Sequence, residues 1–200
     1  DVRYYADLRY TEAAGRELSG ALVCETGREQ PLSCQLQQAV EELGIARLGF
    51  EQGYMTVAEH KRYAASLSCA LAPAQKLVDE LRAVKDGEEL ERVEKAQAIT
   101  DEAFSAILEF LRPGVTEQAV AARLQYEMLR RGAQRMSFDP IVVSGPNGSL
   151  PHGVPGERPI APGSFVTMDF GCVWGGYCSD MTRTVAVGEP TAEMRKVYHT

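Results

Sequence analysis

The sequence predicts two successive domains, an α/β domain over residues 1–84 and an α+β domain over residues 85–200. Within residues 1–72, short apolar runs alternate with stretches of helical periodicity, which is typical of a small α/β domain. A charged stretch at residues 84–89 interrupts this pattern, and we place the boundary there. Beyond it, two helical patterns are followed by strand-like runs, an order that favours an α+β domain.

Each part of the first domain has its own local signals. Residues 21–25 and 45–51 are apolar and short enough to be strands. Between them, apolar residues recur at helical spacing, with Ser33 as the expected N-cap and Gly44 as the terminating residue. Thr56 and Glu59 then have the spacing of a capping box, which predicts the start of another helix.

The second domain opens with two predicted helices. Apolar residues recur at helical intervals over residues 90–111, and a Pro-Gly pair at 113–114 ends the pattern. Thr116 is the expected N-cap of the second helix, which should stop at Gly132. These helices account for the first part of the domain.

Two strand-like runs come next in the chain. Residues 138–143 and 164–169 are rich in β-formers, and the span 145–163 between them is a loop rich in Gly and Pro. The chain then stops at Thr200 inside a pattern that looks like the first turns of an amphipathic helix. We therefore expect a fragment of a longer protein.

Composition limits the classes of function. The net charge is -7, from 21 basic and 28 acidic residues without a basic block, so a nucleic-acid partner is not expected. No apolar run approaches the roughly 18 residues of a membrane span, and no leader pattern opens the chain. Five cysteines, an odd number at irregular spacing, fit reduced thiols better than a disulfide framework. We expect a cytoplasmic protein without a membrane partner.

Two aspartates, Asp169 and Asp180, flank a Gly-rich turn near the end of the chain. If the turn centres on Trp174-Gly175, Asp169 faces Asp180 across an antiparallel hairpin, with Cβ atoms roughly 5 Å apart on one face. Two carboxylates at this distance repel unless divalent cations lie between them, because carboxylate oxygens are ligands for such ions. Spacing alone equally allows two solvated acids on a surface hairpin.

The Asp-Phe-Gly at 169–171 also occurs in protein kinases. A kinase needs a Gly-rich loop, a strand lysine and an H-R-D loop before it, and residues 1–168 contain none of these. The kinase interpretation is therefore rejected.

Several motifs around the hairpin resemble, in order, the metal-binding core of the creatinase/aminopeptidase P/prolidase group, the pita-bread metallopeptidases. They are Ser144-Gly145-Pro146-Asn147, Pro151-His152, residues 163–171, residues 176–180 and Thr182-Arg183-Thr184. Residues 3–14 are similar to a stretch of the family's N-terminal domain, and residues 82–104 to the helix that opens its catalytic domain. The resemblance covers essentially the whole chain.

This resemblance implies a dinuclear metal centre with Asp169 and Asp180 as the first two of five ligands. Asp180 would bridge both ions and Asp169 would hold one, with Mn as the expected metal and Co or Zn as alternatives. The family takes its other ligands, a His and two Glu, from positions after this hairpin. By the resemblance, residues 1–84 form a creatinase-type domain without its first strand. Residues 85–200 form the first part of a pita-bread domain, truncated on its C-terminal side.

The resemblance also assigns a role to His152. It matches the family histidine that lies beside the metals without ligating them and contacts the substrate or the tetrahedral intermediate. Without the resemblance, a loop histidine is more often simply solvated. His60 has no such motif around it and reads as a surface residue.

The function implied is that of an Xaa-Pro aminopeptidase, which removes the N-terminal residue before proline and is expected as a homodimer. The alternative within the enzymes is prolidase, which takes only dipeptides. Creatinase lacks the aspartate pair, and methionine aminopeptidase lacks a matching first domain. A different class is a binding protein on the same fold that has lost the metal. We expect residues 1–200 alone to be inactive.

Overall fold

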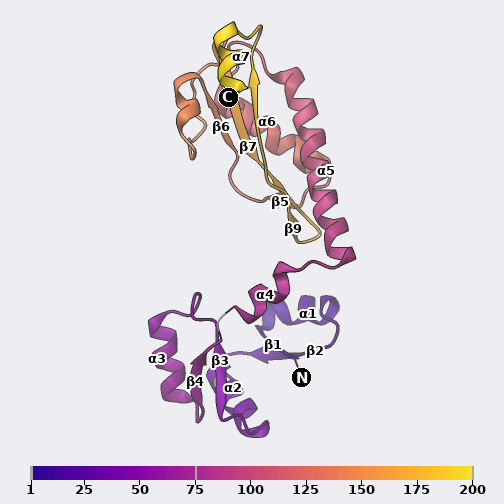
Figure 1. Ribbon diagram of the computed structural model, residues 1–200. Helices are drawn as coiled ribbons and strands as arrows, with labels where there is room; N and C mark the ends of the chain where they lie inside the picture. The colour runs from indigo at the N-terminus through magenta and orange to yellow at the C-terminus, as the bar shows by residue number, and fades with distance from the viewer. Residues whose placement is uncertain (1, 75, 200) are drawn as a thin grey trace. The chain divides into compact units, whose positions relative to one another are not determined.

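The computed structural model describes residues 2–74 and 76–199. The chain forms two compact units, Asp1–Val84 and Lys85–Thr200 (Figure 1). The expected order of an α/β unit before an α+β unit is confirmed.

The first unit contains two parallel strand pairs. β1 (Val2–Asp7) pairs with β2 (Ala21–Thr26), and β3 (Arg47–Phe50) pairs with β4 (Ala70–Pro73). Parallel neighbours need a crossover connection, which α1 (Leu8–Glu17) and α3 (Val57–Ser66) supply. The remaining helices are α2 (Leu32–Glu42) and α4 (Leu77–Ala83). Sequence analysis did not define β1, α1 and β4.

Helix boundaries in this unit test the capping signals. Thr56 and Glu59 form the expected capping box, in which Glu59 N donates to Thr56 Oγ1 at 3.2 Å and Thr56 N donates to Glu59 Oε2 at 2.9 Å. The prediction of Ser33 as an N-cap was wrong, because α2 already begins at Leu32 with Pro31 at its N-cap. Proline's fixed φ suits this entry to the helix without a side-chain cap. Gly44, with φ of 62°, follows the helix as expected.

The second unit places two helices before a three-stranded antiparallel sheet. The helices are α5 (Gly87–Phe110) and α6 (Glu117–Arg130). The sheet has the order β10 (Met181–Ala186), β7 (Phe165–Phe170), β6 (Ile141–Ser144). A smaller sheet contains β5 (Arg135–Met136), β8 (Cys172–Trp174) and β9 (Tyr177–Cys178). The 3₁₀ helix η1 (Gly145–Ser149) follows β6, and α7 (Ala192–Tyr198) follows β10.

The charged stretch at residues 84–89 begins a helix, although it was expected to be a break. Asp86 is the N-cap of α5 and forms a capping box with Glu89, whose N–H donates to Asp86 Oδ1 at 2.9 Å. Acidic side chains are favourable in a first helical turn because they meet free N–H groups and the positive end of the helix dipole. The run of charges therefore starts the helix that carries much of the core.

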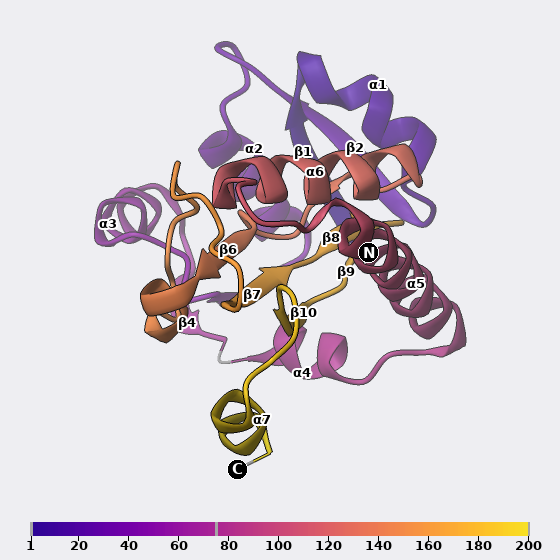
Figure 2. The same cartoon turned by 90° about the horizontal axis from the view of Figure 1, so that it is seen from above.

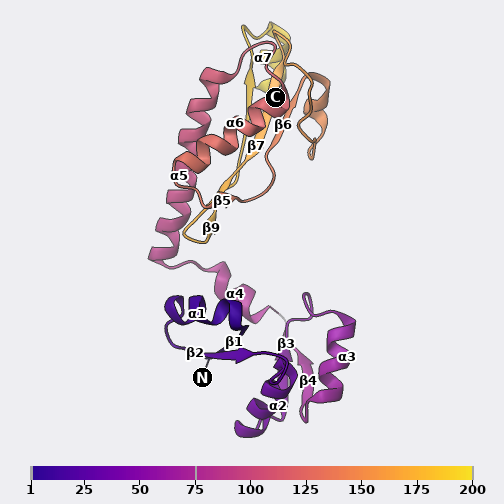
Figure 3. The same ribbon diagram turned by 180° about the vertical axis from the view of Figure 1, so that it is seen from behind.

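The core of this unit lies on one face of the larger sheet. Val166, Met168 and Phe170 alternate along β7 and are fully buried against α5 and α6. Figure 2 shows α5 and α6 on one side of this sheet and α7 on the other, where Phe165 stacks on Tyr198 at 6.2 Å. In Figure 3 the same two helices are seen beside one another from behind. Asp169, by strand alternation, points away from the core.

Two other expectations concern the whole described chain. All five cysteines are free thiols, as expected from their spacing. Over residues 2–74 and 76–199, no helix is both long and apolar enough to cross a bilayer.

Candidate metal centre

The hairpin that carries the two aspartates has a register different from the predicted one. Asp169 lies opposite Thr182, so the prediction that it faces Asp180 directly was wrong. The reason is the turn, which centres on Gly175 and Gly176 with φ of 56° and 82°. Positive φ at both central positions is typical of a type I′ hairpin turn, and glycine adopts it without steric cost. A turn on Trp174-Gly175 would have forced this conformation on a tryptophan.

The corrected register keeps both aspartates on one face. Moving the turn by one residue moves each strand partner by two, and two residues are one full period of a strand. Asp180 therefore lies diagonally across from Asp169, two residues before Thr182. Met181 is 4% exposed and faces the core, whereas the neighbouring Asp180 is exposed. Both carboxylates thus belong to the face opposite the core.

The carboxyl group of Asp169 has one buried oxygen without a hydrogen-bond partner among the described residues. Its backbone pairs with Ile141 on one side and Thr182 on the other, so it sits on the central strand of the sheet. Its Oδ1 atom is buried and has no hydrogen-bond partner among the described residues. Burying a carboxylate oxygen without a donor is costly, and a bound cation would satisfy it. Asp169 therefore fits a divalent metal ion, and Asp180, just before β10, is a second carboxylate on the same face.

Gly171, two residues after Asp169, occupies a position where no side chain fits. A Cβ atom at this position would lie 2.0 Å from the carbonyl oxygen of Ser179 and 2.5 Å from Ser137 Oγ. Ser137 links the two arms of the hairpin. Its N–H donates to Gly171 O at 3.1 Å, and its hydroxyl donates to Ser179 O at 2.9 Å. The missing side chain lets the backbone that leads into Asp180 approach β7 closely.

A buried hydroxyl pair fixes the same stretch from the helix side. Thr100 Oγ1 of α5 lies 2.5 Å from Ser179 Oγ, and Cys172 N donates to Ser179 Oγ at 3.0 Å. Thr100 and Ser179 are 0% and 3% exposed, so these hydrogen bonds are shielded from water. Residue 179 is thereby held immediately before Asp180. Sequence analysis missed Thr100 because its helical position reads simply as part of an apolar face.

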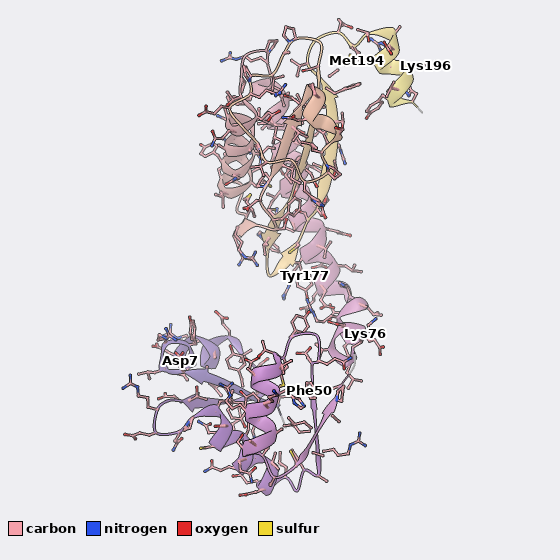
Figure 4. The ribbon with its side chains drawn as sticks, turned by 90° about the vertical axis from the view of Figure 1, so that its left-hand side faces the viewer. Asp7, Phe50, Lys76, Tyr177, Met194 and Lys196 are labelled. Carbon is pink, nitrogen blue, oxygen red and sulfur yellow. The ribbon has the colours of Figure 1, made fainter. Side chains whose placement is uncertain are left out.

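The tip of the hairpin is attached to the first turns of α5. Tyr177 OH donates to Glu89 Oε1 at 2.6 Å, and the Arg92 guanidinium lies 5.9 Å from the centre of the Tyr177 ring. Tyr177 is labelled at this end of the unit in Figure 4. The hydrogen bond from Tyr177 lowers the pKa of Glu89, aided by the backbone N–H of Asp86. The same hydrogen bond raises the pKa of Tyr177.

His152 lies in an exposed turn after η1, on the loop whose Gly153 packs against Val143. The next residue, Gly153, marks this position, since a Cβ atom there would lie 2.4 Å from Val143 Cγ1. Val143 pairs with Thr167, so its side chain shares the face of Asp169. His152 itself makes no hydrogen bond or ion pair with any described residue.

The described residues provide only part of a metal-binding set. Across residues 2–74 and 76–199, no three His, Cys, Asp or Glu side chains are grouped so as to hold an ion. Asp169 and Asp180 are only two acidic side chains, fewer than such a group needs. Cys178, the free thiol nearest to Asp180 in the chain, pairs with Val173 across the hairpin.

Comparison with known proteins identifies the family. Residues 91–200 match the model of metallopeptidase family M24, which is more than half of the chain. The chain belongs to metallopeptidase family M24. Residues 1–84 of this M24 chain match the creatinase/prolidase N-terminal domain.

Individual members of the family resemble this M24 chain in sequence and in structure. It is 44% identical over 196 residues to the uncharacterized peptidase YqhT of Bacillus subtilis, covering 98% of this chain and 55% of the relative. An Xaa-Pro dipeptidase structure from Bacillus anthracis has a TM-score of 0.93 at 39% identity, covering 98% of this chain and 55% of the other. An X-Pro aminopeptidase structure from Thermotoga maritima has a TM-score of 0.89 at 31% identity, with 98% and 56% covered. The chain thus spans about half the length of the curated relatives it matches.

Proposed function

We propose that the full-length protein is a metal-dependent Xaa-Pro dipeptidase, a prolidase. Of the two solved structures compared above, the more similar is named an Xaa-Pro dipeptidase. A prolidase from Pyrococcus furiosus is a further structural neighbour. These neighbours favour the dipeptidase over the aminopeptidase that sequence analysis placed first.

The observation that supports metal dependence is the buried Oδ1 of Asp169, which has no hydrogen-bond donor among the described residues. Asp169 and Asp180 would together supply carboxylate oxygens to a centre of two divalent ions, with Mn as the first choice and Co or Zn as alternatives. When bound, such ions lower the pKa of a coordinated water and polarise the scissile carbonyl. His152, on the loop over the same face, would hold the substrate in place at the reacting carbonyl. The full ligand set would include residues beyond this chain.

The aminopeptidase remains the second candidate, because the Thermotoga maritima neighbour is named an X-Pro aminopeptidase. Both activities act on peptides with proline in second position, whose tertiary amide and fixed φ call for a specialised site. The expected homodimer and cytoplasmic location belong to this proposal.

The test measures hydrolysis of an Xaa-Pro dipeptide and an Xaa-Pro-Yaa tripeptide by the full-length protein with added Mn, Co or Zn. A prolidase should cleave the dipeptide and leave the tripeptide intact. Cleavage of the tripeptide would replace the proposal with the aminopeptidase. Absence of turnover with every metal would support the binding-protein alternative.

A pair of aspartate variants tests the metal ligand. Asp169→Asn should abolish metal-dependent turnover, because an amide oxygen carries no charge to hold the ion. Asp101→Asn is the matched control, since Asp101 is exposed on α5, on the other side of the sheet from Asp169. Equal activity in both variants would exclude Asp169 as a ligand.

A further inference from the structure

Glu117 is a buried carboxylate at the start of α6 that the proposed chemistry does not use. It is 1% exposed, and among the described residues no Lys, Arg or His forms an ion pair with it. It accepts three hydrogen bonds instead. Ser144 donates to Oε1 from both its N and its Oγ, each at 2.7 Å, and Gly156 N donates to Oε2 at 3.3 Å. A buried carboxyl group is tolerated where hydrogen-bond donors of this kind replace water.

The donors come from the two ends of one loop. Ser144 is the last residue of β6, and Gly156 lies beyond the turn that carries His152. The backbone of α6 strengthens the attachment, because Gln118 N donates to Gly156 O at 3.0 Å and Glu117 N donates to Arg158 O at 3.2 Å. A single side chain on α6 thus closes the loop over residues 144–156.

Between these ends, the loop is seated on the aspartate face of the sheet. Leu150 N donates to Asn147 O at 2.9 Å, and Gly153 N donates to Leu150 O at 3.2 Å, so the turn around His152 has internal hydrogen bonds. Gly153 lies against Val143, whose side chain shares the face of Asp169. Fixing the ends of the loop therefore fixes where His152 stands relative to the candidate metal centre.

We propose that Glu117 is a positioning residue of the peptidase, which holds the His152 loop over the candidate metal centre through its carboxylate. The proposal rests on the proposed function, in which His152 contacts the substrate. Because Glu117 does not touch the reacting atoms, it acts through the loop.

We call the contacts of Glu117 with Ser144 and Gly156 the clamp. The clamp needs a hydrogen-bond acceptor at both terminal atoms of the Glu117 side chain. A carboxylate presents an acceptor oxygen to Ser144 and another to Gly156, whereas a glutamine amide presents one oxygen and one N–H donor group. In Glu117→Gln, either Ser144 or Gly156 therefore faces a donor with its own N–H. Volume and shape hardly change, so the substitution removes one end of the clamp without leaving a cavity.

Glu127 supplies a matched control on the same helix. It is also a glutamate with 1% exposure, but its partners are Arg123, Arg130 and Arg131 and not the loop. Glu127→Gln should lower stability without moving His152. A loss of activity caused only by a weaker fold would appear in both variants.

The experiment compares the full-length protein with Glu117→Gln, Glu127→Gln, His152→Ala and the Glu117→Gln/His152→Ala double variant, on an Xaa-Pro dipeptide with Mn. We expect Glu117→Gln to lower kcat/KM by about tenfold to a hundredfold, the range that follows from misplacing a catalytic contact by about 1 Å. We expect Glu127→Gln to stay near wild type. In the His152→Ala background, Glu117→Gln should have no further effect, because both changes remove the same contact.

Backbone amide hydrogen exchange over residues 144–156 gives a readout that is independent of turnover. Exchange should accelerate in Glu117→Gln and stay unchanged in Glu127→Gln. Unchanged exchange in Glu117→Gln, or effects of Glu117→Gln and His152→Ala that simply multiply, would overturn the positioning role. A wild-type protein without turnover, or a fully active His152→Ala variant, would instead overturn the proposed function, whatever the exchange shows at Glu117.

Discussion

The substitution Gly171→Ala tests the close approach that shapes the candidate metal centre. The added Cβ would lie 2.0 Å from Ser179 O, whereas a favourable non-bonded contact between heavy atoms needs about 3.5 Å. The backbone before Asp180 must therefore move by on the order of 1 Å, since the obstructing atom belongs to the main chain. Ser137 Oγ, at 2.5 Å from the same position, would have to move as well.

Two consequences are expected in the full-length protein. Overpacking of this kind costs roughly 1–3 kcal/mol of unfolding free energy, measurable by urea denaturation. The affinity for Mn, measured by isothermal titration calorimetry, should fall by at least tenfold, because a displaced Asp180 can no longer share an ion with Asp169; that corresponds to about 1.4 kcal/mol. The two losses have one cause and should appear together.

Gly87→Ala is the control, because nothing lies within 4 Å of a Cβ added at Gly87 and its φ is not in the left-handed region. Alanine is the better helix former there, so stability should be unchanged or rise by up to about 1 kcal/mol. If Gly171→Ala unfolds at the wild-type urea concentration and binds Mn with wild-type affinity, the reasoning about close approach is refuted.

Three further outcomes are expected. Tyr177→Phe should raise the pKa of the Glu89 carboxyl, because the hydrogen bond from Tyr177 is the main cause of its lowering; carboxyl ¹³C NMR titration measures this. The pKa of Glu127 is lowered from 4.5, chiefly by a hydrogen bond from Arg131, so its stabilising effect is present above the unfolded-state pKa and is lost as pH falls through the folded-state pKa. Glu127→Gln should therefore flatten the fall of stability below about pH 4.5 in acid titrations followed by circular dichroism. Residues 1–200 alone should not cleave an Xaa-Pro peptide with added Mn, because two carboxylates do not hold a dinuclear centre; measurable turnover would contradict this.

Local signals in the sequence were sufficient for much of the fold. The capping box at Thr56 and the N-cap at Thr116 are interactions within one helical turn, so spacing alone identifies them. The strand of Asp169 was recognisable as a short run rich in β-forming residues. The N-cap prediction failed at Ser33, because Pro31 is the N-cap and the helix already begins at Leu32.

Local sequence signals could not predict the hydrogen bonds that position Asp180, because these bonds join residues far apart in the chain. Thr100 meets Ser179 across 79 positions, and Ser137 meets Ser179 across 42. No periodicity or spacing rule connects such pairs. Glu117 carries no sequence signal of its own beyond an acidic residue after an N-cap, and its bonds to the loop depend on the packing of α6 beside β6.

The observed register of the hairpin sets the distance between the two aspartates. Directly opposed aspartates would have Cβ atoms about 5 Å apart, which leaves little room between the carboxyl groups. In the observed diagonal arrangement the neighbouring residues are roughly 7–8 Å apart, with the Cβ atoms somewhat closer, which leaves more space for carboxylates to reach ions placed between them. Two ions in a shared site lie about 3.5–4 Å apart, a separation that suits the wider spacing. The paired glycines of the turn, by moving the register by two residues, thus make Asp169 and Asp180 better suited to two ions than the predicted pairing was.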